Sequence, residues 1–212
     1  MTERDVFKAG LVLGAQFGGN FEMPSLERVD FKPNAAIPFE KAYRRGKTQK
    51  WLHFYTHDRH FERVWNHPKR YLPMFGRFGG VISPDFSLFR ELPLAVQIWN
   101  TYRGRAIASW LQRKGIDVVP NVRWSDERSY AFAFEGLPTE GSVAVSTHGC
   151  IGNGLDRHYF KKGLARMMKV LRPKTVINHG QTPEDIFGKY LDDGVEVIQI
   201  PYYYAATGKA VL

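Results

Sequence analysis

The 212-residue chain has little cysteine, no long hydrophobic run and no match to the common nucleotide-binding loop motifs. Its single cysteine, Cys150, excludes an internal disulfide and every cysteine-based zinc pattern, which fits a reducing compartment. No apolar run approaches the roughly 20 residues of a membrane helix. The first residues also lack a charged segment followed by an apolar one, as a secretion signal would have. We therefore expect a cytoplasmic protein without a membrane segment.

Negative charge is scarce relative to positive charge. The chain has 30 Lys+Arg and 21 Asp+Glu residues, so its formal net charge is +9. Such an excess favours an anionic partner, namely nucleic acid, a nucleotide or an acidic protein, although a merely solvated basic surface explains it too. The densest basic block spans residues 41–50, and further cations recur at helical spacing over 157–169. The predicted nucleic-acid surface comprises Arg44, Arg45, Lys47, Lys161 and Lys162.

Short apolar runs alternate with helical patterns from about residue 51 onward, which is typical of a parallel α/β sheet. The expected strands cover residues 52–55, 80–84, 118–122, 143–145, 175–177 and 195–200. The expected helices cover residues 58–66, 93–114 and 156–171, and another begins at Thr182. We predict a single α/β domain over residues 51–212 with flanking helices and a mostly parallel sheet of about six strands, either open or a reduced barrel. Residues 1–50 show no clean period and are predicted to form an N-terminal arm packed on this body.

Three details of the helices also follow from the pattern. Pro68 is expected to end the first helix, and Asp126 is expected to cap a helix after the third strand. The buried stripe of the 93–114 helix is predicted from apolar residues at helical spacing, which are Ala95, Trp99, Tyr102, Ala106 and Trp110.

Polar residues follow almost every predicted strand, and in parallel sheets the ligand crevice lies beyond the carboxyl ends of the strands. The sharpest segment is residues 83–87, where Asp85 is the expected acid, base or metal ligand and Ser87 an expected ligand contact. If the strands are neighbours, Asp58 lies near Asp85, and such a pair could bind a divalent cation. The cofactor is otherwise unknown. Helix capping by these carboxylates is the structural alternative.

Arg123 and Trp124 end the third strand. An arginine for an anion and a tryptophan for a stacked base would together hold a nucleotide. A core position for Trp124 with a surface charge at Arg123 explains the same pair equally well.

Asn100 and Arg103 lie beside the buried stripe of the long helix. A partly buried arginine requires a carboxylate or phosphate partner. The two interpretations are a ligand phosphate and an internal ion pair, the second with Asp85 or Asp126.

Residues 147–154 connect a strand to a helix and are rich in glycine. Exposed backbone N–H groups at Gly149, Gly152 and Gly154 could hold a phosphate, although a flexible loop explains the glycines as well. His148 in this loop and His179 after the next strand are the candidates for moving protons near neutral pH. Each could equally be a hydrogen-bonded structural histidine.

Several segments together resemble a known family. They are His53-Phe54-Tyr55, residues 82–87 with Pro-Asp-Phe-Ser, residues 97–105 with Gln-Ile-Trp-Asn, and residues 120–125. The chain resembles domain of unknown function 4417, a family of bacteria, their phages and other mobile elements, over about residues 37 to 180. The resemblance implies a phage or mobile-element origin and, for a phage-encoded protein, a place in the host cytoplasm. It brings no activity or catalytic residue.

Two hypotheses follow, and the sequence leaves open whether the protein is an enzyme. In the first, a pocket at the strand ends binds or processes a phosphate-bearing ligand, either a nucleotide or nucleic acid. In the second, a non-enzymatic accessory protein binds DNA or a host protein through its basic surfaces. The oligomeric state is not indicated by the sequence.

Overall fold

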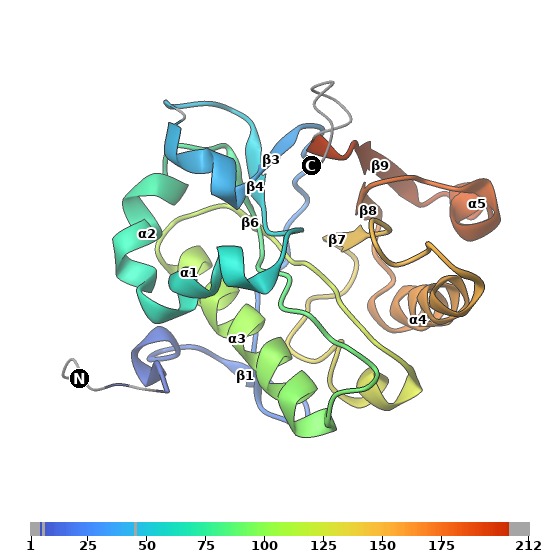
Figure 1. Ribbon diagram of the computed structural model, residues 1–212, viewed down its shortest axis with the longest axis horizontal. Coiled ribbons are helices and arrows are strands. Elements are labelled where there is room, and N and C mark those ends of the chain that lie inside the picture. The colour runs from blue at the N-terminus through green and yellow to red at the C-terminus, as the bar shows by residue number, and fades with distance from the viewer. Residues whose placement is uncertain (1–4, 6, 45, 204–212) are drawn as a thin grey trace.

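The computed structural model describes residues 5, 7–44 and 46–203 and shows a parallel α/β sheet with helices packed on it (Figure 1). The strands are β1 (Phe17–Gly18), β2 (Met23–Pro24), β3 (Ala36–Pro38), β4 (Trp51–His53), β5 (Gly80–Ile82), β6 (Val118–Val119), β7 (Ser142–Ser146), β8 (Thr175–His179) and β9 (Glu196–Ile200). The α-helices are α1 (Glu62–Asn66), α2 (Pro68–Phe75), α3 (Leu94–Arg113), α4 (Gly154–Leu171) and α5 (Glu184–Asp192). Short 3₁₀ helices are η1 (Ala9–Leu11), η2 (Phe39–Arg44), η3 (Asp58–His60) and η4 (Glu127–Ala131).

The strands pair in the order in which they occur in the chain. β3 to β6 form one parallel set and β7 to β9 another. A parallel bridge between Asn121 and Ala144 joins the two sets, and the Ala144 N–H donates to the Pro120 carbonyl at 2.8 Å. All seven carboxyl ends therefore lie at the same edge. The predicted α/β fold with a mostly parallel sheet is confirmed, and no pairing between β3 and β9 closes a barrel within the described ranges.

The N-terminal segment contributes to this sheet as well as covering it. β1 and β2 form an antiparallel hairpin, while β3 pairs in parallel with β4 at the sheet edge. The Glu135 carboxylate fixes the hairpin turn by accepting from the N–H groups of Asn20 at 2.7 Å and Phe21 at 2.9 Å. Residues 17–38 are thus tied to the main body by backbone pairing and by a carboxylate far along the chain.

The sheet is curled, as shown by the meeting of residues from its two ends in one apolar cluster. The buried members of this inner cluster are Trp51, Tyr55, Ile82, Val119, Ala144, Ile177 and Ile200. Two further clusters lie on the other face, one beneath α1, α2 and α3 and one beneath α4 and α5 (Figure 1). Each large apolar side chain buried in this way contributes on the order of 1.5–3 kcal/mol. The result is an open, curved sheet whose concave side is filled by side chains.

Helix boundaries occur near Pro68 and at Asp126 as expected, but the helices that begin there differ from the expectation. Pro68 begins α2, because proline is tolerated in the first helical turn, where its missing N–H would have no partner. Asp126 does cap a helix, accepting from the Arg128 N–H at 3.1 Å, but this helix is only the five-residue η4. The chain then carries Phe132 and Phe134 into the core. None of the helices in the described part of the chain is long and apolar enough to cross a membrane.

The long helix α3 buries a polar face near its start. Trp99 is 37% exposed and Ala95 is also exposed, whereas Gln97, Asn100 and Thr101 are buried. The predicted stripe is therefore wrong in the first half of the helix, although Ala106 and Trp110 are buried as expected. The buried polar side chains have partners. Gln97 accepts from the Ser125 hydroxyl at 2.6 Å and so links α3 to the segment after β6.

Candidate functional site

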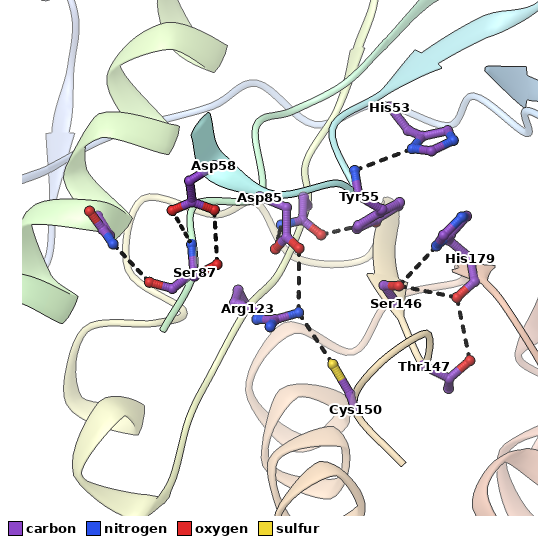
Figure 2. A network of polar contacts seen from close by, with 12 residues as sticks. His53, Tyr55, Asp58, Asp85, Ser87, Arg123, Ser146, Thr147, Cys150 and His179 are labelled. Atoms are coloured by element: carbon purple, nitrogen blue, oxygen red, sulfur yellow. Dashed lines mark hydrogen bonds and ion pairs between the residues drawn. The ribbon is translucent and has the colours of Figure 1, made fainter. Parts of the chain in front are cut away.

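Asp85 lies at the centre of the polar side chains that follow the strands (Figure 2). The extended segment after β5 carries it, and only 8% of the residue is exposed. Its Oδ1 accepts from Asn121 Nδ2 at 2.8 Å, and its Oδ2 accepts from Arg123 Nη1 at 3.3 Å. Tyr55 donates its hydroxyl to Asn121 Oδ1 at 2.9 Å. The ends of β4, β5 and β6 are therefore joined by one network of side chains.

Burial controls the protonation of Asp85. Desolvation raises the pKa of the Asp85 carboxyl above its ordinary value. Arg123 and the hydrogen bond from Asn121 act in the opposite direction, and the nearby Asp58 charge raises the pKa further. A carboxyl group whose pKa is raised from the ordinary range is suited to exchange a proton closer to neutral pH.

Arg123 has donors that no described residue engages. Its Nη1 contacts Asp85 and also lies 3.3 Å from Cys150 Sγ. No other hydrogen bond or ion pair of this guanidinium occurs in the described part of the chain, so Nε and Nη2 have no partner there. The Asp85 charge raises the pKa of Arg123, so the group stays cationic. A fixed guanidinium with two remaining donor nitrogens is suited to a phosphate or carboxylate.

A cavity of about 280 Å³ lies beside Arg123, and we call it the first cavity. It is lined by residues 88–91, 122–125, Ser146, Gly149, Cys150, Asp156, Tyr159 and Phe160. Arg90 is part of this lining and forms an ion pair with Asp156 at 2.7 Å. Its guanidinium carbon lies 4.8 Å from the centre of the Tyr159 ring. The first cavity therefore combines two arginines with partly exposed aromatic surface.

Asp58 and the expected ligand contact Ser87 bind each other outside this cavity. Asp58 accepts from the Ser87 N–H at 3.1 Å and from its hydroxyl at 2.8 Å. Asn100 donates to the Ser87 carbonyl at 2.7 Å and accepts from Arg103 Nη2 at 2.6 Å. Arg103 also forms an ion pair with Glu62 at 2.6 Å. The ion pair of Arg103 is internal, with Glu62 in place of the expected Asp85 or Asp126, and this network joins α1 and α3 to the strand ends.

Three aromatic rings fill the centre of the curved sheet at this edge. The centroid of His179 lies 4.7 Å from that of His53 and 4.6 Å from that of Tyr55. His179 Nδ1 contacts the Ser146 hydroxyl at 3.0 Å, and His53 Nδ1 accepts from the Tyr55 N–H at 3.2 Å. The Nε2 atoms of both histidines are buried without a hydrogen-bond partner in the described structure. Among the described residues, each imidazole is therefore hydrogen-bonded through Nδ1 only.

These histidines are neutral at physiological pH. Burial lowers the pKa of His179 to about 3, with a smaller contribution from His148. Desolvation also lowers the pKa of His53 well below its ordinary value. His148 is exposed and stacks on Tyr202 with centroids 4.1 Å apart, and partial burial lowers its pKa as well. At pH 7 His179 is therefore a neutral imidazole, with one ring nitrogen that accepts and one that donates a hydrogen bond, and it lacks the second proton of a general acid.

Trp124 is part of the core. It is buried, donates Nε1 to the Tyr159 carbonyl at 3.2 Å, and packs against Phe134 and Phe160. Gly163 of α4 lies directly against its ring, and a methyl group there would be 2.0 Å from Trp124 Nε1. Trp124 still lines the first cavity, but the more exposed aromatic side chains there are Phe89 and Tyr159.

The glycine-rich loop lies between β7 and α4. Gly149 has φ of +73°, a backbone conformation that favours glycine, and it lines the first cavity. Gly152 lies farther along the loop and Gly154 is the first residue of α4, and at both an added Cβ would meet nothing within 4 Å. Asn153 caps α4 by accepting from the Asp156 N–H at 2.9 Å. The loop backbone is thus open to solvent next to the first cavity.

The predicted basic surface is partly neutralised. On α4, Lys161 pairs with Asp185 at 3.4 Å and Lys162 pairs with Glu127 at 2.9 Å. Lys47 is exposed. Arg44 ends η2, and Arg45 lies outside the described residues.

No group of three or more His, Cys, Asp or Glu side chains in the described part of the chain is arranged to hold a metal ion. Asp58 and Asp85 are close enough to interact electrostatically, but each is bound by protein donors. The cation that a carboxylate pair would favour therefore has no ready-made set of protein ligands among these residues.

Sequence reasoning did not single out several residues of this site. Asn121 donates to Asp85 and accepts from Tyr55, Ser146 contacts His179, and Arg90 and Tyr159 line the first cavity. Asn121 and Ser146 did carry a signal, since each lies at the end of a predicted strand. Arg90 and Tyr159 had none, because only the three-dimensional fold brings the segment after β5 against α4.

Comparison with known proteins gives a family but no activity. Residues 15–201 match the family described as Domain of unknown function (DUF4417). The chain is 32% identical over 164 residues to the Gene 1 protein of Mycobacterium phage L5, an alignment that covers 76% of this chain and 72% of that protein. It is 34% identical over 197 residues to the Gene 1 protein of Mycobacterium phage D29, covering 90% of this chain and 70% of that one. No solved structure matches significantly. The expected resemblance and the phage relationship are confirmed.

Proposed function

The chain belongs to the DUF4417 family, and we propose that its first cavity binds or processes a phosphate-bearing ligand held by Arg123. The observation that carries this proposal is the guanidinium of Arg123. It is fixed by Asp85 through Nη1, lines a cavity of about 280 Å³, and has two further nitrogens that no described residue engages. The net charge of +9 favours the approach of an anion to the whole molecule.

The size of the first cavity favours a small ligand. Ligand sites typically measure about 300–1,000 Å³, so 280 Å³ accommodates a ligand near the lower end of that range, such as one nucleotide. Tyr159 and the guanidinium of Arg90 above it supply planar surface for a base. Arg90 is also a second cation, which is already paired with Asp156.

Asp85 is the residue to which we assign proton transfer in any reaction at this site. It is held by Asn121 and Arg123 in a fixed orientation, and burial raises the pKa of its carboxyl. Asp58 supports it electrostatically, because its negative charge favours the protonated form of Asp85. We assign no acid role to His179, since its pKa of about 3 leaves it unprotonated at neutral pH.

The alternative is an accessory protein that binds DNA or a host protein through its basic surfaces. We rank it second because Lys161 and Lys162 are already paired with Asp185 and Glu127. A variant with both lysines replaced by glutamate distinguishes between the two proposed functions. The accessory function requires loss of binding in this double variant, whereas the cavity function requires only a small, salt-dependent change.

Calorimetric titration of thymidine monophosphate tests the proposal in low-salt buffer, with and without magnesium. Wild type, Arg123→Gln and Arg28→Gln are compared. Arg28 is exposed and pairs with Asp30, next to the Val29 carbonyl that bonds the first residue of β7, so it lies at the opposite end of the strands. We expect Arg123→Gln to weaken binding at least about tenfold, as loss of a charged hydrogen bond does, and Arg28→Gln to have little effect. Equal affinity in all three proteins would refute the assignment of Arg123.

A further inference from the structure

A second cavity, of about 480 Å³, lies at the same edge of the sheet. Its lining comes from the ends of β7, β8 and β9 and from the loop before α4, and it includes His148, Arg157, Gln181, Gln199 and Tyr202. Gly149 lines both cavities. The two cavities are therefore neighbours on either side of one exposed loop.

The second cavity repeats the chemistry of the first. The His148 ring is exposed and stacks on Tyr202 at 4.1 Å with an interplanar angle of 16°, which gives a flat aromatic surface. Arg157 lies in the same lining and forms an ion pair with Asp185. In the first cavity, Tyr159 and Arg123 supply the corresponding aromatic and cationic groups. Each cavity thus offers a stacking surface for a base and a guanidinium, although that of Arg157 is already bound by Asp185 through Nε and Nη2.

The two cavities meet at Gly149, which is exposed. At Gly149 an added Cβ would meet no atom within 4 Å, so the backbone of the loop is uncovered where the two linings join. A chain that connects two occupants would meet no side chain at Gly149 itself, the residue that the two linings share. A lining residue shared by both cavities favours one extended ligand over two unrelated small ligands.

From this arrangement we propose that the ligand is single-stranded nucleic acid, with adjacent nucleotides in the two cavities and the linking phosphate over Gly149. The inference rests on the proposed function of the first cavity and extends it. The two bases must leave a continuous stack to enter separate cavities, which a single strand allows and an intact duplex does not. The net charge of +9 suits a polyanion better than one small anion.

The test compares ligands of increasing length. Thymidine monophosphate, the dinucleotide pTpT, a dT hexamer and a 20-base-pair duplex are titrated into wild type, Tyr202→Leu and Tyr43→Leu. Tyr43 is an exposed tyrosine of η2 that lines neither cavity and serves as the control. We expect pTpT to bind at least about tenfold more tightly than the monophosphate, as one further stacked base does. Tyr202→Leu should reduce pTpT affinity to the monophosphate level without changing monophosphate binding, and Tyr43→Leu should change neither.

The outcomes separate this inference from the function on which it rests. If the monophosphate binds in an Arg123-dependent manner but pTpT and the hexamer bind no more tightly, the second cavity is not part of the site and the inference falls alone. The same conclusion follows if the duplex binds as tightly as the hexamer, or if pTpT affinity is unaffected by Tyr202→Leu. If no ligand of any length binds, the proposed function falls and the inference with it.

Discussion

His53 and His179 lie on strands separated by three others in the sheet order, yet their rings pack with centroids 4.7 Å apart. Only a curled sheet allows this contact, because β4 and β8 would be far apart in a flat one. The contact also places two neutral, buried imidazoles next to the network around Asp85. The stability of the fold at this edge therefore depends on histidines that remain unprotonated.

Acid should destabilise the protein through His179. The pKa of His179 is about 3 in the folded state, whereas an unfolded histidine titrates near 6.5. Below about pH 6.5 the unfolded chain binds a proton that the folded state does not, so the free energy of unfolding falls as the pH decreases towards 3. We expect His179 alone to account for about 2–3 kcal/mol of this loss at pH 4.5. Urea denaturation between pH 8 and 4.5 measures it.

The control for this prediction is a histidine on the surface. His179→Asn should lower stability at pH 8 but flatten its decline with pH, while His158→Asn should leave the decline unchanged because His158 is exposed on α4. Parallel declines in wild type and His179→Asn would show that other groups are responsible.

Replacement by alanine should change the free energy of unfolding strongly at one glycine of α4 and hardly at all at another. At Gly163 the added methyl group would lie 2.0 Å from Trp124 Nε1, so the buried indole would have to shift from its packed position. At Gly154 it would meet nothing within 4 Å. We expect Gly163→Ala to lower the free energy of unfolding by about 2–3 kcal/mol, as overpacking does, and Gly154→Ala to leave it within about 0.5 kcal/mol. Thermal denaturation of both variants decides this, and a stable Gly163→Ala protein would contradict the packing of Trp124 described above.

Asp85 should limit the affinity of the site for anions. Its carboxylate neutralises Arg123 at 3.3 Å, so Asp85→Asn should increase nucleotide affinity about three- to tenfold at low salt while abolishing any turnover that uses Asp85 as an acid or base. Asp30→Asn makes the same charge change beside Arg28, at the other end of the strands, and should alter neither property. Unchanged affinity and turnover in Asp85→Asn would refute both the charge effect and the proton-transfer role assigned to Asp85.

The fold was predictable because the sequence marks its strands and helices locally. Short apolar runs, the Thr182-Pro183 helix start and Gly115 after α3 are signals carried by neighbouring residues. The position of Asp85 beyond a buried strand was predictable for the same reason. No such local signal marks the curl of the sheet, which depends on how seven strands pack around the inner cluster.

The polar face of α3 was not predictable from hydrophobic spacing. Gln97 and Asn100 are buried because Ser125 and the Ser87 carbonyl supply partners from other strand ends. Arg105 is buried with carbonyls as its acceptors, including that of Ala133 at 2.8 Å, and burial lowers its pKa to about 9. A pattern that assigns polar residues to the surface places all three on the wrong side of the helix.

The most direct test of the central claim uses the single cysteine as a probe of the first cavity. Cys150 lines this cavity and its Sγ lies 3.3 Å from Arg123 Nη1, so a phosphate held by Arg123 should shield the thiol. The measurement is the alkylation rate of Cys150 by iodoacetamide, with and without saturating thymidine monophosphate, in wild type and Arg123→Gln. We predict a severalfold slower reaction in wild type with the nucleotide and, at the same nucleotide concentration, weaker protection in the variant, because its affinity is lower. An unchanged rate in wild type while calorimetry shows the nucleotide bound would contradict the account, because the ligand would then lie elsewhere.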